Sequence, residues 1–169
     1  IGFSDYFNNI GIPFEKILEK LGINKALHKS IKLTYFKNSS KHFNTIKTYS
    51  NVKYIINYYK KKSIKIGIVT SKEKKNTLKL IKKFNFNIKI VSCPAAHLRG
   101  KPYPDQLLNI LKKNNVKPKE AVYIGDMKVD YQAAFRSKIS FIFAKYGYGK
   151  QYPFYKHTIH NIKGLLKLI

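Results

Sequence analysis

Five polar residues could do chemistry together, because they fall in three groups at or near the ends of short apolar runs. Thr70 and Ser71 follow one run, Asp126 follows another with Asp130 four residues later, and Lys101 lies between them beside two prolines. Hydroxyls and free backbone N–H groups at a helix start can hold a phosphate. A lysine fixed by prolines can act as a point charge on a phosphoryl group. Clustered carboxylates are hard oxygen ligands suited to Mg²⁺.

Each group also has a purely structural interpretation. Thr70 and Ser71 could cap a helix, and Lys101 could be a solvated lysine before a helix that starts at proline. Asp126 could be a helix cap and Asp130 a surface residue. The last interpretation is the least satisfactory, because the chain has only eight acidic residues.

The elements that must position these residues alternate from residue 50 onward. Apolar runs predict strands, and helical spacing predicts helices between them. We expect strands at 64–69, 88–92, 121–124 and 139–144, and helices at 52–62, 73–84, 104–113, 129–136 and 161–168. This alternation predicts an α/β fold with a mostly parallel sheet. Ligands then bind beyond the carboxyl ends of the strands, where the three groups lie.

The first 49 residues contain no convincing strand, and we expect helices at 14–21, 26–36 and 41–48. Pro13 and Gly22 suit the start and the stop of the first of these. The chain therefore divides into a helical domain at 1–49 and an α/β core domain at 50–169.

The net charge of +26 is extreme, but only Arg99 and Arg136 among the 34 basic residues are arginine. A protein selected for nucleic-acid contacts would be expected to use more arginine, whose planar fork binds phosphate and guanine through two bonds. The lysines are also spread along the whole chain. We therefore predict no specific nucleic-acid partner, although the charge would attract a phosphorylated substrate.

No apolar run approaches the length of a membrane span, and no targeting segment is recognisable at the start. The single cysteine, Cys93, suits a reducing compartment. We therefore expect a cytoplasmic protein without a membrane partner. The sequence does not indicate an oligomeric state.

The three groups, in this order, resemble motifs of the haloacid-dehalogenase superfamily. The resemblance is to its phosphatase branch with a helical cap, and is closest to phosphoglycolate-phosphatase-like members. Thr70 matches the strand-terminal hydroxyl of the second motif, and Lys101 matches the lysine of a Lys-Pro-x-Pro third motif. The sequence from Gly125 to Asp130 matches Gly-Asp-x-x-x-Asp, the fourth motif. The resemblance implies a Rossmann-like three-layer core, with residues 1–49 as the inserted cap.

The resemblance also implies a mechanism, in which phosphoryl transfer to an aspartate gives an aspartyl-phosphate that water hydrolyses. Lys101 and Thr70 would be catalytic, and would bind a small phosphorylated metabolite together with Ser71. Asp126 and Asp130 would hold Mg²⁺.

The Asp-x-Asp first motif of the superfamily, which carries the nucleophile, does not occur in this chain. The chain begins at Ile1 rather than Met, and we expect a truncated, inactive fragment of a longer parent that is a Mg²⁺-dependent phosphatase. In the superfamily this motif ends a central strand. We therefore expect the strands that end at Thr70 and Asp126 to flank a gap.

Alternatives on the same fold are a phosphomutase, a pseudoenzyme and a basic nucleic-acid-binding protein. A mutase transfers the phosphoryl group to a sugar, and a nucleic-acid binder shows steep salt dependence without phosphatase activity. An upstream Asp-x-Asp would favour an enzyme over a pseudoenzyme.

Overall fold

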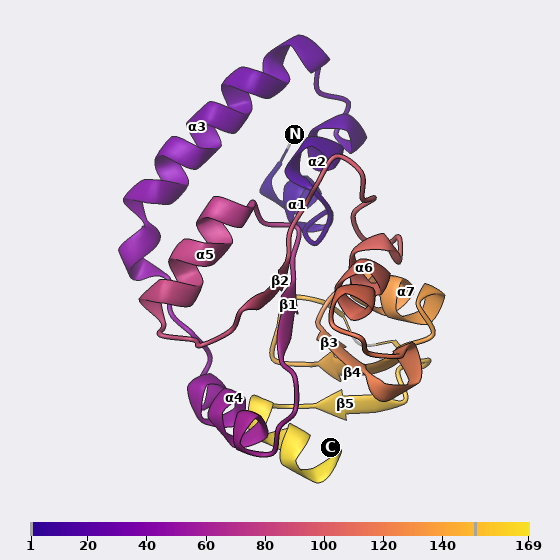
Figure 1. The fold of residues 1–169 in the computed structure, drawn as a ribbon. Coiled ribbons are helices and arrows are strands. Elements are labelled where there is room, and N and C mark those ends of the chain that lie inside the picture. The colour runs from indigo at the N-terminus through magenta and orange to yellow at the C-terminus, as the bar shows by residue number, and fades with distance from the viewer. Residues whose placement is uncertain (1, 151) are drawn as a thin grey trace.

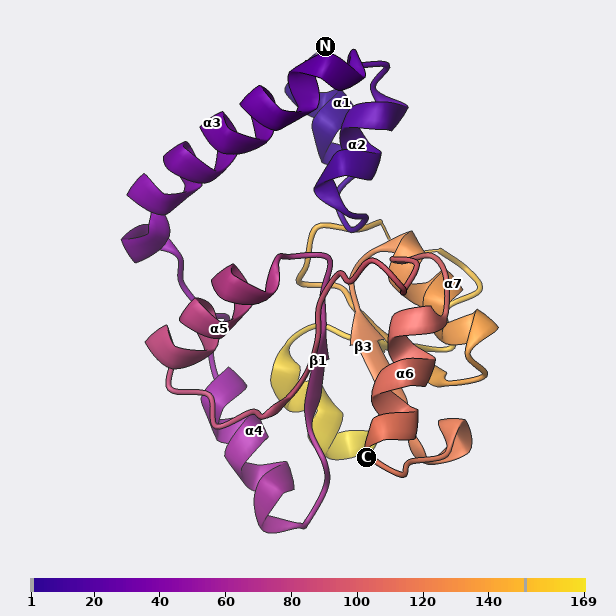
Figure 2. The same cartoon turned by 45° about the horizontal axis from the view of Figure 1, so that its top comes forward.

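The computed structural model describes residues 2–150 and 152–169. Its N-terminal part is helical and lies apart from the strands (Figures 1 and 2). This part contains α1 (Phe3–Phe7), α2 (Phe14–Lys20) and α3 (His28–Lys41), with short 3₁₀ turns η1 (Lys25–Leu27) and η2 (Phe43–Thr45). As expected, α2 begins directly after Pro13 and ends before Gly22, which has a positive φ of 67°.

The remainder alternates between helices and strands, so the predicted α/β class with parallel strands is confirmed. The elements are α4 (Val52–Lys61), β1 (Gly67–Val69), α5 (Lys74–Lys83), β2 (Ile90–Ser92), α6 (Asp105–Lys113), η3 (Pro118–Glu120), β3 (Val122–Gly125), α7 (Lys128–Arg136), β4 (Ser140–Ala144), β5 (His157–Ile159) and η4 (Ile162–Lys167).

The strands form two separate parallel sheets rather than one. β1 pairs only with β2, with Ile68 opposite Val91, whereas β3, β4 and β5 form a second sheet in that order. β1 and β3, which precede Thr70 and Asp126, are therefore not hydrogen-bonded to each other. The expectation that these strands are not direct partners is confirmed.

The two sheets nevertheless belong to one three-layer core. On one side, Val69 of β1 and Tyr123 of β3 pack against the same cluster, which includes Leu107 of α6 and Ala133 of α7. On the other side, residues of α4 and η4 cover the strands, and Ile66 and Ile124 pack against that cluster. Helices thus cover both faces, and partly buried residues at β1 and β3 pack against both clusters, although Gly67 and Val122 are exposed.

Three sequence expectations for individual elements were wrong. The helix expected at 26–36 runs to Lys41, and the one expected at 41–48 is only the short turn η2 followed by non-helical chain. The closing helix is 3₁₀ rather than α, and β5 was not expected. Short 3₁₀ turns have the same local periodicity as a helix start, and a strand of three residues has too little pattern to stand out.

Within the described residues, no helix has the length and apolarity that crossing a membrane would require.

Candidate active site

A buried ion pair joins two of the predicted site residues. Lys101, in the loop between β2 and α6, places its Nζ 2.6 Å from Oδ1 of Asp130 in the first turn of α7. Only 8% of the lysine side chain and 5% of the aspartate side chain are exposed. Burying two charges is costly unless they are paired and hydrogen-bonded, so this contact fixes both side chains in place.

The other hydrogen bonds of Asp130 complete its surroundings. The hydroxyl of Tyr123, on β3, donates to Oδ1 over 3.1 Å, and the backbone N–H of Met127 donates to Oδ2 over 3.0 Å. Burial, and then the nearby Asp130 carboxylate, hold the pKa of Tyr123 well above its ordinary value. Tyr123 therefore stays protonated and remains a donor to Asp130 at neutral pH.

Asp126 directly follows β3. Its side chain contacts the glycine-rich loop that follows β4. Its Oδ2 accepts the backbone N–H of Tyr148 over 2.7 Å. A Cβ at Gly147 would overlap the Asp126 side chain, and one at Gly149 would overlap the Asp126 carbonyl. Glycine is required at both positions because the backbone of this loop packs directly on Asp126.

Thr70 and Ser71 follow β1 but have different partners. The hydroxyl of Thr70 accepts the backbone N–H of Lys72 over 3.1 Å, which leaves its own hydrogen free to donate elsewhere. The hydroxyl of Ser71 donates to the carbonyl of Gly11 over 2.6 Å. Ser71 therefore links the core to the helical N-terminal part.

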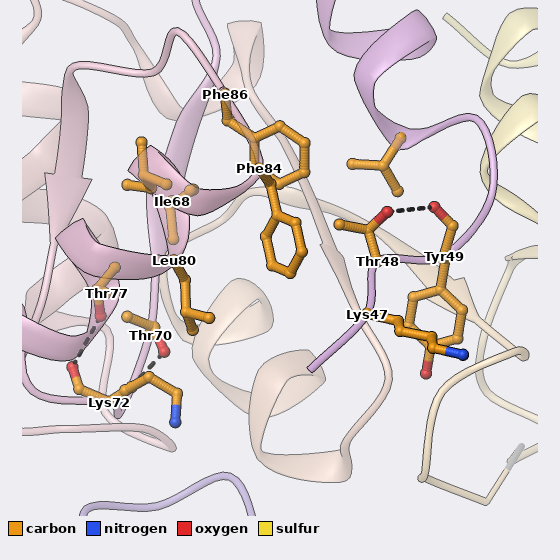
Figure 3. A pocket seen from close by; sticks show the side chains of 12 residues that line it. Lys47, Thr48, Tyr49, Ile68, Thr70, Lys72, Thr77, Leu80, Phe84 and Phe86 are labelled. Carbon is orange, nitrogen blue, oxygen red and sulfur yellow. Dashed lines mark hydrogen bonds between the residues drawn. The ribbon is translucent and has the colours of Figure 1, made fainter. Parts of the chain in front are cut away.

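Two pockets adjoin Thr70. The first, with a volume of about 300 Å³, is lined mainly by apolar side chains of β1, α5 and the segment before α4. In Figure 3, Phe84, Phe86, Leu80 and Ile68 surround its space, while Thr70 and Lys72 lie at one side. The lining also includes two lysines, Lys47 and Lys72.

The second pocket, of about 310 Å³, lies between the helical N-terminal part and the core. Thr70, Ser71 and Lys101 line its core side. Three of the five predicted site residues therefore share one hollow, and Asp130 adjoins it through its bond to Lys101.

Comparison with known protein families decides the assignment. The sequence pattern described as haloacid dehalogenase-like hydrolase matches residues 4–144. The chain belongs to this family. The match spans both the helical N-terminal part and most of the α/β core. No curated protein matches the chain.

Solved structures of similar fold superpose on almost the whole chain. A hydrolase from Pseudomonas syringae superposes with a TM-score of 0.89 at 20% identity, covering 99% of this chain and 82% of that chain. A predicted phosphoglycolate phosphatase from Haemophilus somnus gives 0.84 at 18% identity, with coverages of 99% and 82%. CbbY from Rhodobacter sphaeroides, in complex with phosphate, gives 0.80 at 15% identity, with coverages of 96% and 81%. At these identities the likeness shows the fold alone.

Asp126 and Asp130, the two carboxylates that follow β3, are the residues that were expected to bind a metal ion. No group of three or more His, Cys, Asp or Glu side chains gathers anywhere in residues 2–150 and 152–169. Asp126 and Asp130 provide two carboxylates. Both oxygens of Asp130 accept hydrogen bonds, whereas Asp126 has one oxygen, Oδ1, without a bond among the described residues. The donor set fits part of a Mg²⁺ site, because Mg²⁺ often uses one or two carboxylates and keeps several waters.

The sequence did not reveal three residues of the candidate site. These residues contribute through their contacts with Asp126 or Asp130. Tyr123 is visible only as the apolar residue of a strand that ends at Gly125. The contacts of Tyr148 and Gly149 with Asp126 are made by main-chain atoms, which no side-chain type reveals. The closely spaced glycines at 147 and 149 were the one available signal.

Proposed function

We propose that the full-length parent is a Mg²⁺-dependent phosphatase acting on a small phosphorylated metabolite through an aspartyl-phosphate. In this proposal residues 1–49 act as a cap over the core at 50–169, and the protein works in the cytoplasm. The observation that carries it is the buried Lys101–Asp130 pair, with Lys101 and Thr70 lining one pocket beyond the carboxyl ends of β2 and β1. Residues of this chemistry, held together at this place, suit phosphoryl transfer.

The chain's own residues would bind and neutralise the phosphoryl group. The Nζ of Lys101 keeps two further N–H donors beyond its bond to Asp130, and these can reach a phosphoryl oxygen and the nucleophile. The hydroxyl oxygen of Thr70 accepts the backbone N–H of Lys72. Its hydrogen therefore stays available to donate to a second phosphoryl oxygen. Both contacts strengthen as negative charge develops on the transferring group.

The nucleophile would come from a strand between β1 and β3. Its carboxylate oxygen attacks phosphorus and the alcohol leaves; water then attacks the aspartyl-phosphate and releases inorganic phosphate. β1 and β3 each have an unpaired edge, which supports such a strand because an open strand edge can pair with another strand. The fully buried Gln106, whose Nε2 reaches the Thr70 carbonyl, has an Oε1 without a partner.

Asp126, with Asp130 supporting it, would hold Mg²⁺, which when bound neutralises charge on the phosphoryl oxygens. The bond from Tyr148 N–H orients the Asp126 carboxylate so that Oδ1 is left for this role.

The helical part would exclude water from the site. It meets the core at the Ser71–Gly11 hydrogen bond and where Pro13 packs against Gly100, at which a Cβ would come within 2.6 Å of Pro13 Cγ. Closure of this kind protects a reactive intermediate from side reactions.

The experiment is a phosphate-release assay on the purified full-length parent with p-nitrophenyl phosphate and acetyl phosphate. We expect turnover with Mg²⁺ and its loss in EDTA, restored by added Mg²⁺. Turnover that is equal with and without EDTA would rule out the metal-dependent proposal, and no turnover of either compound would rule out a phosphatase.

A further inference from the structure

One wall of the second pocket is aromatic, and it lies where the leaving group of a bound phosphate ester would lie. Thr70, Ser71 and Lys101 form its phosphate end, and the side formed by the helical part carries four aromatic rings. These are Tyr6, Phe14, Tyr35 and Phe36. Its volume of about 310 Å³ lies at the small end of ligand sites, which run from roughly 300 to 1,000 Å³. A small ester would fill it.

The four rings form one continuous aromatic surface. Phe14 stacks on Tyr35 with centroids 4.5 Å apart, and it meets Phe36 at 6.4 Å and Tyr6 at 6.5 Å. Burial, with a hydrogen bond to Tyr35, raises the pKa of Tyr6 far above its ordinary value, so the hydroxyl of Tyr6 stays neutral. The wall therefore offers aromatic ring surface and the neutral hydroxyl of Tyr6 to a bound ligand.

Away from the phosphate end, the one cation of the pocket is already paired. Lys32 on α3 lies 3.0 Å from Glu15 and 3.2 Å from Glu73, so two carboxylates surround one ammonium. Lys101 pairs with Asp130, and Lys72 belongs to the phosphate end, next to Thr70. Away from the phosphate end, the charged residues that line the pocket are thus one lysine and two glutamates.

We infer that the substrate is a small phosphate monoester whose leaving group is uncharged and carries an apolar ring, and not one that bears a second carboxylate. A ring would stack on the aromatic surface. A carboxylate there would lose its water without gaining a free cation and would face the excess negative charge of Glu15 and Glu73. This inference rests on the proposed phosphatase function and narrows its substrate class.

The test compares kcat/KM of the full-length parent with Mg²⁺ for phenyl phosphate, 2-phosphoglycolate and acetyl phosphate. Acetyl phosphate has a leaving group too small to use the ring surface fully, so it reports the chemistry of the core. We expect phenyl phosphate to exceed 2-phosphoglycolate by about tenfold or more, the factor that one good aromatic contact supplies.

Two variants locate the effect in the pocket. Tyr35→Ala should lower the ratio of kcat/KM for phenyl phosphate to that for acetyl phosphate by about tenfold. Tyr54→Ala, an exposed tyrosine on α4 that does not line the pocket, should leave this ratio unchanged. The double variant Glu15→Gln/Glu73→Gln frees Lys32 and should raise kcat/KM for 2-phosphoglycolate about tenfold, whereas Glu120→Gln should not.

The outcomes separate the two proposals. Turnover of acetyl phosphate with equal or better kcat/KM for 2-phosphoglycolate than for phenyl phosphate overturns the substrate inference alone. No response of either ratio to the pocket variants also overturns it. Absence of turnover with all three compounds overturns the phosphatase function, and the substrate inference with it.

Discussion

Asp126 is a single residue whose charge can be removed with little change in shape. Its carboxylate accepts one hydrogen bond, from Tyr148 N–H, and the side-chain oxygen of asparagine can accept the same bond. We expect Asp126→Asn in the full-length parent to lower kcat by about 100-fold or more, because a lost metal contact costs several kcal/mol in the transition state. The thermal midpoint should shift by only a few degrees. Circular dichroism melting beside the activity assay checks both, and unchanged turnover would exclude Asp126 as a metal ligand.

Lys101 contributes to stability as well as to chemistry, because it neutralises a buried carboxylate. Lys101→Met should lower the free energy of unfolding by about 3–5 kcal/mol, the usual cost of leaving one partner of a buried pair unpaired. Adding Asp130→Asn removes the uncompensated charge and should restore more than half of that loss, while activity stays absent. Urea unfolding of the full-length protein measures the cycle, with Lys89→Met as an exposed-lysine control. A double variant as unstable as the single one would contradict this assignment.

At this scale the sequence was most informative where a residue type and a strand end coincide. Thr70 and Asp126 were placed at strand ends from short apolar runs followed by polar residues, and Lys101 was singled out by its neighbouring prolines; Thr70 and Lys101 do line one pocket. The partners of Asp130 were less accessible to prediction. Tyr123 reads as an ordinary strand residue, and the N–H of Met127 belongs to the backbone.

At the scale of elements, α5 holds the segment that joins the helical part to the core. The ammonium group of Lys83 donates to the carbonyls of Phe43, Asn44 and Ile46, at 2.7, 2.9 and 2.9 Å. These three acceptors lie where a helix at 41–48 was expected. These carbonyls accept hydrogen bonds from a lysine that is distant in sequence, and they do not form an α-helical ladder. Such a tertiary contact produces no periodic pattern in the sequence.

This contact predicts that Lys83→Met loosens the joint. Because the bonds are largely exposed, we expect them to contribute only about 1 kcal/mol in total, which corresponds to ~5-fold faster cleavage of residues 43–50 under limited proteolysis. Lys82→Met, an exposed neighbour on the same helix, is the matched control. Equal cleavage rates in the two variants would show that Lys83 does not hold this segment.

At the scale of the whole molecule, the divided sheet links chemistry to stability. The alternation of apolar runs predicted parallel strands and helices on both faces, and the structure has them. The resemblance carried by Thr70, Lys101 and Gly125–Asp130, with its first motif missing, also implied that β1 and β3 are not direct partners, as the structure shows. The small β5 and the 3₁₀ character of η4 were not predictable, because elements of three to six residues depend on contacts made elsewhere in the chain.

The central claim is that Thr70, Lys101 and Asp126 act with a nucleophile supplied by a strand between β1 and β3. Side-by-side measurement of Mg²⁺-dependent p-nitrophenyl phosphate hydrolysis by the full-length parent and by residues 1–169 tests it most directly. The account predicts turnover by the parent and none above background by residues 1–169, which lack both the attacking carboxylate and the strand between the two edges. Equal turnover by the two proteins would contradict it.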